Sequence, residues 1–389
     1  MILLTVLYLV ITALFAWMTI SAIYHLRWVQ RLPVNVSDRL EPSLNDGIQV
    51  LEKCSVVIAA RDEESRIEST VRHLLAQQGV VLEIIVVNDR SVDQTGEILS
   101  KLSQQFAQVR AIKVEEVPND WLGKCHACHI GASAATGDWI LFTDADCWIK
   151  HDVIARALRV AKIEGVDHVT LTPGIEGHSI GTQAWHLAFL ITLANWFSGV
   201  NRDRPKSYLG MGAFNLVRSS AYRNCGGYED LKLTVLDDVR LGLLLRRAGF
   251  RTRAFVGGDD VVCHWGTTVG NMIRIMEKNY FAALDYRLAP AIIASLGGTL
   301  VWMFAIVGPF TGTVAGIAAG ISMFSISIPA FLLSKRLGWG TACAIVTPLI
   351  FLCMFYAIFR SAWLTTWRRG VSWRGTHYSL ESLRKGSVK

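Results

Sequence analysis

The 389-residue chain has few charged residues. Only 18% of its residues are Asp, Glu, Lys or Arg, whereas about 25% is usual in a soluble globular domain. The charge is missing above all from residues 1–24 and from about residue 288 to 364, where apolar residues dominate. These stretches exclude an ordinary water-soluble protein and predict membrane-embedded segments on either side of a region of normal charge.

No lysine or arginine precedes the first apolar run, whereas Arg27 and Arg31 follow it. A secretory signal peptide has the opposite asymmetry, with positive charge ahead of its apolar core. The run is also long enough to cross a bilayer core of about 30 Å. We therefore expect an uncleaved anchor at residues 1–24, and the positive-inside rule predicts that the region after it is cytoplasmic.

The eight cysteines do not form a disulfide framework, because they are scattered and two of them fall inside apolar runs. A reducing cytoplasm would keep them as thiols. One cluster at residues 125–129 has the C-x-x-C-H spacing of covalent haem attachment. No second Cys/His pair at ligand spacing follows, which argues against zinc. A haem or redox protein that uses Cys125, Cys128 and His129 is kept as an alternative.

Strand-like and helix-like segments alternate in the first half of the central region. The β-rich runs are 54–60, 83–89, 109–115, 138–146 and 166–173, and the helix-like stretches are 63–77, 94–106, 124–136 and 151–164. Apolar strands separated by helices predict an α/β fold with a mostly parallel sheet and helices on both faces. Ligands in such folds bind beyond the carboxyl ends of the strands.

Two pairs of carboxylates are candidates for chemistry. Asp144 and Asp146 end an apolar strand, where their mutual repulsion would be relieved by a divalent cation that also binds substrate phosphates. The alternative for this pair is a solvated turn. Asp237 and Asp238 begin a predicted helix over 235–253, where acidic residues can simply cap the helix. The functional interpretation is a general base that takes a proton from an attacking hydroxyl.

The second half of the chain contains further apolar segments. Residues 181–199 predict a helix packed on the domain or lying at the membrane interface rather than a span, because His186 and Asn195 interrupt it. Three more segments, at 289–308, 312–333 and 341–364, could each cross a membrane. Three crossings would place the basic tail outside, against the positive-inside rule. A half-span or hairpin would keep the tail cytoplasmic and bound at the membrane interface, the arrangement we favour.

The formal net charge is +7. Nucleic-acid binding is one interpretation of a basic chain. However, seven of the positive charges lie in the last 30 residues, beside an apolar segment and three tryptophans, and this placement favours anionic lipid over nucleic acid. They are Arg360, Arg368, Arg369, Arg374, Arg384, Lys385 and Lys389.

The order of the motifs resembles the family 2 glycosyltransferases, which have the GT-A fold. The membrane flanks are similar to the lipid-glycosylating subset of that family, which includes ceramide, carotenoid and hopanoid-biosynthesis-associated transferases. The matching motifs are AARDEE (59–64), VVNDRSVDQT (86–95), GKCHACHIGASAATGD (123–138), DAD (144–146) and LDDVRLGLLLRRAGFRT (236–252).

The resemblance implies a nucleotide-sugar donor and residues to bind it. Asp89 would bind the base, Lys124 would approach the base or the diphosphate, and Asp144 would touch the ribose or the metal. The remaining pocket residues would be Ala60, Arg61 and Glu63.

The resemblance also implies the reaction, a single inverting displacement. Asp146 would hold Mg²⁺ or Mn²⁺ across the diphosphate, and Asp238 would be the catalytic base, with Asp237 in place of the family's Glu. His264 could approach the metal or the diphosphate, or could equally be packed at a strand end beside Trp265.

The resemblance favours transfer of one sugar to a lipid acceptor at the cell membrane. The Q/R-x-x-R-W motif of processive polysaccharide synthases is missing from NMIRIMEKNYFAALDYR (271–287), although a polymer synthase remains the nearest enzymatic alternative. The predicted organisation is an anchor (1–24), a linker (25–52), a GT-A domain (53–270), a possible interfacial helix (271–287), a transmembrane region of about three segments (288–366) and a basic tail (367–389).

Overall fold

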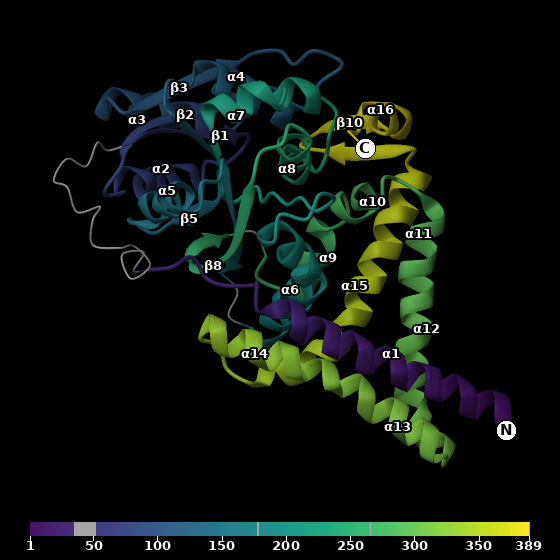
Figure 1. Cartoon of the computed structure of the whole chain (residues 1–389). Helices are drawn as coiled ribbons and strands as arrows, with labels where there is room; N and C mark the ends of the chain where they lie inside the picture. Colours follow the sequence, from purple (N-terminus) through teal and green to yellow (C-terminus); the bar gives the residue numbers. More distant parts are fainter. Residues whose placement is uncertain (35–51, 177–178, 265, 389) are drawn as a thin grey trace, which may run out of the picture.

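The computed structural model describes residues 1–34, 52–176, 179–264 and 266–388. An α/β domain carries apolar helices that extend away from it (Figure 1). Most of the expected linker, residues 35–51, lies outside the described residues. The described part before it packs on the domain, because Val29 and Leu32 are buried and Arg31 forms a β-bridge with Val256.

One eight-stranded mixed sheet organises the domain, in the order β3-β2-β1-β4-β7-β6-β8-β5. The pairings β1–β2, β1–β4, β2–β3 and β6–β8 are parallel, and β7 and β5 run antiparallel to their neighbours. The strands are β1 (Lys53–Ala60), β2 (Val81–Asp89), β3 (Val109–Val114), β4 (Trp139–Asp144), β5 (Cys147–Ile149), β6 (His168–Ile175), β7 (Asn215–Arg218) and β8 (Thr252–Cys263).

Helices cover both faces of the sheet, because successive side chains of a strand point to opposite sides. Val56 and Ile58 of β1 pack in the cluster under α2 (Ile67–Leu75), α3 (Thr95–Gln105) and α5 (Val153–Glu164). Val57, between them, packs on the other face with α4 (Gly123–Ala134) and α8 (Asp237–Arg247). The prediction of an α/β fold is confirmed, with a sheet that is parallel around β1 and mixed beyond β4.

The apolar stretch near residue 190 forms α6 (Ile180–Asn201). It packs between β8 and the apolar helices α1 and α15, and it is not among the helices long and apolar enough to cross a membrane. This agrees with the expectation of a packed or interfacial helix. The segment after β7 continues through α7 (Ser219–Asn224) and the 3₁₀ helix η3 (Gly227–Leu231) to α8.

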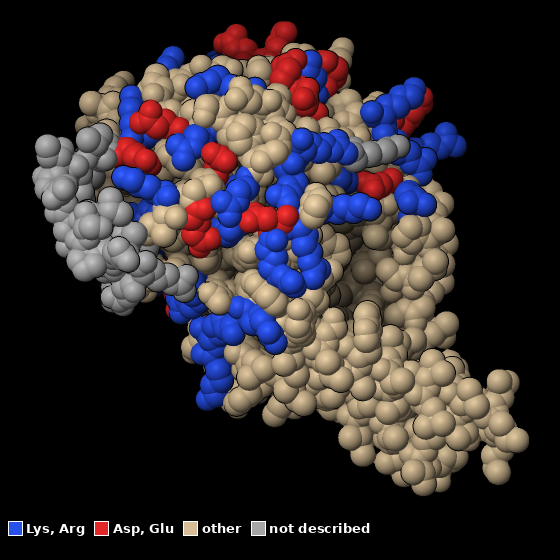
Figure 2. Space-filling model, in the orientation of Figure 1, with Lys and Arg blue, Asp and Glu red and all other residues tan. Residues whose placement is uncertain are grey.

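Four helical segments have the length and composition of membrane spans: α1 (Ile2–Leu26), Leu288–Thr311, Val314–Leu337 and α15 (Ala342–Trp367). Figure 2 shows charged side chains over the α/β domain, whereas the protruding part of the apolar helices is free of them on the visible face. The second segment comprises α11 (Leu288–Ile292), η4 (Ile293–Gly297), α12 (Gly298–Val307) and η5 (Gly308–Thr311). The third comprises α13 (Val314–Met323), η6 (Phe324–Ile326) and α14 (Ser327–Leu337).

Polar contacts join these apolar helices to one another. The hydroxyls of Thr19 and Ser325 lie 2.6 Å apart between α1 and η6, and Trp302 Nε1 donates to the Pro348 carbonyl at 2.7 Å. Arg336 at the end of α14 donates to the Leu26 carbonyl at the end of α1. Such hydrogen bonds stabilise helix packing where lipid offers no alternative partner.

The segment 271–287 forms two short helices, α9 (Val269–Ile275) and α10 (Asn279–Ala283), instead of one interfacial helix. The residues after α15 form a β-hairpin, β9 (Gly370–Trp373) and β10 (Thr376–Ser379), followed by α16 (Leu380–Gly386). We expected this tail at the membrane interface. The tail packs on the rest of the protein, where Arg374 pairs with Glu63 of the α/β domain and Arg384 donates to the Tyr286 carbonyl. Its place at a membrane interface stays a prediction.

Candidate active site

One cavity of about 920 Å³ collects the polar residues at the carboxyl ends of β1, β2 and β4. Its walls include every residue predicted for the donor, the metal and the base except His264. They are Ala60, Arg61, Glu63, Asp89, Lys124, Asp144, Asp146, Asp237 and Asp238. Their common position follows from the parallel strands, whose carboxyl ends meet at one edge of the sheet.

Asp89 is a buried carboxylate at the end of β2. Arg90 Nε donates to it at 2.8 Å, and Arg61 Nη1 lies 3.9 Å away. The carboxylate also packs against the start of α4, where a Cβ on Gly123 would lie only 2.2 Å from Asp89 Oδ2. Glycine at position 123 therefore allows the backbone of α4 to approach this end of the cavity closely.

Lys124 connects the two acidic pairs. Its Nζ lies 2.8 Å from Asp144 Oδ1 and 3.6 Å from Asp237 Oδ1. Burial disfavours the ammonium form, but Asp144, Asp237 and Asp238 outweigh it and raise the pKa of Lys124 well above its usual value. Lys124 is thus a fixed positive charge in the cavity, and it lowers the pKa of Asp144 despite the burial of that carboxylate.

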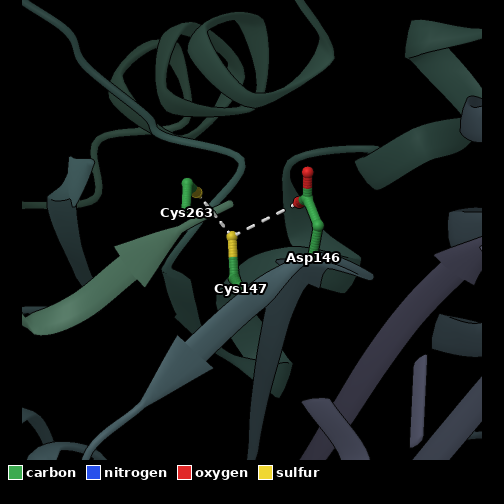
Figure 3. Close-up of side chains that lie close together, drawn as sticks. All are labelled: Asp146, Cys147 and Cys263. Carbon is green, nitrogen blue, oxygen red and sulfur yellow. Dashed lines mark hydrogen bonds between the residues drawn. The ribbon is translucent and has the colours of Figure 1, made fainter. Parts of the chain in front are cut away.

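Asp146 has no such cation. Burial raises the pKa of Asp146 to about 6, and the negative charges of Asp144 and Glu63 add to the shift. Its carboxylate accepts a weak hydrogen bond from the Cys147 thiol at 3.8 Å, and Cys147 Sγ lies 2.6 Å from Cys263 Sγ across β5 and β8 (Figure 3). No Lys, Arg or His lies within ion-pair distance of Asp146 in the described part of the chain.

The acidic cluster fits a divalent cation. Asp144 and Asp146 offer hard oxygen ligands beside a cavity, and the repulsion that raises the pKa of Asp146 would be relieved by a bound metal. Asp146, Cys147 and Cys263 also lie within 4.8 Å of one another through their ligand atoms. Both thiols are buried, and burial raises the pKa of the Cys147 thiol, so the hard carboxylate oxygens are the better ligands for Mg²⁺ or Mn²⁺.

His264 lies beside this cluster without facing the cavity. Its Nδ1 is 3.2 Å from the Asp146 carbonyl, its Nε2 is 4.0 Å from Glu176, and its ring packs on Trp148. Trp265, the partner expected from the sequence, lies outside the described residues. The geometry favours the packed interpretation of His264 over that of a metal ligand.

The two carboxylates at the start of α8 point in different directions. Asp237 is buried and accepts a hydrogen bond from Tyr228 Oη at 2.9 Å. Asp238 Oδ2 accepts from the Gly212 backbone N–H at 2.6 Å. Burial raises the pKa of Asp238 to about 6, with Asp237 adding to the shift and Lys124 opposing it. A carboxylate with that pKa is suited to take a proton near neutral pH.

The sequence reasoning missed part of the cavity wall. Trp373, Arg374 and Tyr378 line it from the carboxyl-terminal hairpin, and Lys278 lines it from the segment between α9 and α10. Lys278 lies 4.1 Å from the centre of the Trp373 ring. An arginine followed by glycine between two short β-rich runs could have predicted the hairpin. No local pattern predicts where that hairpin packs.

The C-x-x-C-H residues do not form a cofactor site. Cys125 and Cys128 are buried in the core between α4 and η3, and burial raises the pKa of both thiols. His129, one helical turn after Cys125, lies 3.6 Å from Glu229 of η3 and packs on Trp121. The haem alternative therefore has no support in the geometry, since the thiols face packed side chains.

Comparisons with known proteins indicate a glycosyltransferase. Residues 55–226 match the family model Glycosyl transferase family 2. The chain is 23% identical over 356 residues to a 4,4'-diaponeurosporenoate glycosyltransferase of Staphylococcus aureus strain bovine RF122 / ET3-1, covering 84% of this chain and 88% of that protein. The same protein from strain USA300 is 23% identical over 352 residues, with the same shares covered.

A solved structure shares the architecture. The mannosyltransferase PcManGT of Pyrobaculum calidifontis, in complex with GDP-Man and Mn²⁺, has a TM-score of 0.56 at 16% identity, covering 94% of this chain and 99% of that one. The fold is thus that of the GT-A glycosyltransferases. More narrowly, residues 55–226 match the family 2 model, so the chain carries a glycosyltransferase domain of this type.

Proposed function

We propose that the protein is a metal-dependent, inverting glycosyltransferase that moves a sugar from a nucleotide-diphosphate sugar to an isoprenoid, hopanoid or sphingolipid-like acceptor. One observation carries the proposal of a lipid acceptor. The cavity that contains the acidic residues extends without a break to apolar side chains, some of which belong to the candidate membrane helices.

The apolar end of the cavity suits a lipid chain. Trp185 and Phe189 of α6, Met272 of α9 and Met354 of α15 line it. Trp196 also lines the cavity and is 48% exposed, so the apolar wall continues to the surface. A hydrocarbon acceptor would gain about 25 cal/mol per Å² buried along this wall.

Unpartnered polar atoms favour an acceptor that also carries hydrogen-bonding groups. His186 Nε2, Asn279 Oδ1 and Tyr280 Oη are buried and have no hydrogen-bond partner among the described residues, and all three residues line the cavity. Such groups are costly unless a ligand or water satisfies them. A lipid with a hydroxyl or carboxyl group near its reacting end fits this wall better than a pure hydrocarbon.

The donor end suits a nucleoside diphosphate. Lys124 and Arg61 supply positive charge beside Asp89, whose carboxylate is placed to accept hydrogen bonds from a base. A divalent metal held by Asp146 and Asp144 would stabilise the charge that develops on the leaving diphosphate. The GDP-Man and Mn²⁺ in the mannosyltransferase complex support this assignment.

In the proposed reaction Asp238 takes the proton of the acceptor hydroxyl. The hydroxyl oxygen then attacks the anomeric carbon as the bond to the diphosphate breaks, which inverts that centre. Gly212 N–H orients the Asp238 carboxylate through the hydrogen bond at 2.6 Å. Asp237 holds the Lys124 ammonium beside Asp144, where its positive charge would stabilise the negative charge of the leaving diphosphate.

We also propose a multi-pass cell-membrane protein with the catalytic domain and the tail both in the cytoplasm. Arg240 pairs with Asp285 just before the second apolar segment, and Arg374 pairs with Glu63 after the last one. Both contacts link the ends of the three later apolar segments to the α/β domain. The chain would therefore enter the first of these segments and emerge from the last on the side of the membrane where the domain lies. An even number of the three later segments would then cross the bilayer.

The direct test uses membranes that contain the protein, a panel of radiolabelled nucleotide sugars, and Mn²⁺ or Mg²⁺. We expect one donor to label a lipid-extractable product that carries a single sugar, as judged by mass spectrometry. Membranes with the Asp238→Asn variant are the matched control. Label found only in a long polymer would support the synthase alternative instead, and no label in lipid from any donor would contradict the proposal.

A further inference from the structure

The hairpin formed by residues 370–379, here called the tail hairpin, reaches the donor end of the cavity. Its turn consists of Arg374 and Gly375, both with positive φ (48° and 76°), as in the type I′ turn that suits the twist of two-residue hairpins. Figure 1 shows the tail hairpin between the end of α15 and α8. The turn thus presents Arg374 at the tip of a short, regular hairpin.

Two side chains of the tail hairpin contact residues assigned to the donor. Arg374 forms an ion pair with Glu63, although 311 residues separate them in the sequence. Tyr378 Oη accepts a hydrogen bond from Gly123 N–H at 3.3 Å, at the start of α4 beside Asp89. Arg374 also contributes to the lowered pKa of Asp144, after the larger effect of Lys124. The hairpin therefore spans the donor end from Asp89 to Asp144.

The hairpin is firmly anchored at its base. Leu383 of α16 is completely buried, and Val371 of β9 is 6% exposed. Arg384 donates to the Tyr286 carbonyl at 3.0 Å. On the side of the hairpin that faces the cavity, the Lys278 ammonium lies over the Trp373 ring. No carboxylate among the residues described lies within ion-pair distance of Lys278. The wall at this end of the cavity thus contains two cations, Lys278 and Arg374, whose positive charge nearby carboxylates do not neutralise fully.

We propose that the tail hairpin is a donor-binding element, in which Arg374 binds the diphosphate and Tyr378 contacts the nucleoside. This inference rests on the nucleotide-sugar donor proposed above. Arg374 uses Nη2 on Glu63, which leaves further guanidinium donors for phosphate oxygens, and planar guanidinium groups bind such oxygens in pairs. Tyr378 stands beside Asp89, where the base would lie. Residues of the carboxyl terminus therefore join a site whose predicted donor and base residues all precede position 239.

The test is calorimetric titration of GDP and of UDP, each with Mn²⁺, into the full-length protein in lipid nanodiscs, without any acceptor. We expect Arg374→Ala to lower the affinity for the nucleotide that the wild type binds by about tenfold or more. This is the effect expected from the loss of a charge-assisted hydrogen bond. Arg374→Lys should recover part of the affinity, and Tyr378→Phe should weaken binding by about threefold.

Lys385→Ala is the matched control, because it removes a positive charge from the same tail. Lys385 pairs only with Glu381 on α16, and we expect no change in nucleotide affinity. Wild-type affinity in both Arg374 variants would overturn the inference while leaving the proposed function intact. A wild type that binds neither nucleotide with Mn²⁺ would contradict the donor assignment itself. If Arg374→Ala fails to fold, Arg374→Lys and Tyr378→Phe decide the question.

Discussion

Asp238 Oδ2 accepts a hydrogen bond from the Gly212 backbone N–H at 2.6 Å, and a Cβ on Gly212 would lie 2.8 Å from Asp144 Oδ2. This one glycine therefore places the proposed base against the proposed donor and metal carboxylate. A side chain at position 212 would separate the two acids. The relationship joins the start of α8 to the end of β4, which are far apart in the sequence.

Asp238→Asn should lower the transfer rate by about 10²–10⁴-fold, the usual contribution of a general base. Asparagine can still accept the hydrogen bond from Gly212, so the fold and the nucleotide affinity should persist. Single-turnover transfer gives the rate, and calorimetry gives the affinity. The control is Asp167→Asn, because Asp167 pairs with Arg218 away from the cavity. A wild-type rate in Asp238→Asn would exclude this residue as the base.

The pH dependence of transfer should report the same carboxylate. Burial and Asp237 raise the pKa of Asp238 to about 6, so the active, ionised form is lost as the pH falls through about 6. We expect kcat/KM for the acceptor to be level above that pH and to fall about tenfold per unit below it. The profile is measured at saturating Mn²⁺. A profile that stays flat down to pH 4.5 would contradict the assignment.

Removal of the metal should abolish transfer, and Asp146→Asn should weaken Mn²⁺ activation by at least about tenfold. The ionised form of Asp146 is disfavoured by burial, Asp144 and Glu63, as its raised pKa shows. Above pH 6 the metal-free variant should therefore unfold at a higher temperature than the metal-free wild type. Manganese titrations of activity and thermal scans with EDTA test both effects. Equal manganese dependence in variant and wild type would count against Asp146 as a ligand.

Gly123→Ala should raise the KM for the donor by about tenfold, because the new methyl group must displace Asp89. Its Cβ would lie 2.2 Å from Asp89 Oδ2, well inside contact distance. Gly340→Ala is the control, since nothing lies within 4 Å of a Cβ at that glycine. Steady-state kinetics with varied donor measure the effect. An unchanged donor KM in Gly123→Ala would mean that Asp89 does not contact the donor.

The sidedness of the tail can be tested with engineered cysteines at the exposed positions Lys101, on the domain, and Lys385, in the tail. Seven native cysteines are buried and Cys353 is partly buried, so surface labelling should come from the new thiols. We expect a membrane-impermeant maleimide to label both variants in inside-out vesicles and neither in intact cells. Labelling of Lys385→Cys from outside would show that an odd number of the later segments crosses.

The sequence alone determined the alternation of strands and helices, the apolar segments and the edge at which polar residues gather. These features depend on local periodicity, because the pattern of apolar residues that predicts a strand or a helix extends over only about a dozen residues. The positions of Asp89 at the end of β2 and of Asp144 at the end of β4 followed from the same local pattern. The sequence did not indicate that β7 enters the sheet antiparallel between β4 and β6.

Only the tertiary structure decided which of the conspicuous residues meet. The cysteines of the C-x-x-C-H cluster pack in the core, and His264 packs on Trp148 with its Nδ1 3.2 Å from the Asp146 carbonyl. Arg374, which composition suggested would face lipid, pairs with Glu63 at the donor end. Composition describes how much charge a segment carries, whereas the partner of that charge depends on where distant parts of the chain pack. That packing brings the tail hairpin to Glu63 and Gly123, which lie more than two hundred positions earlier in the sequence.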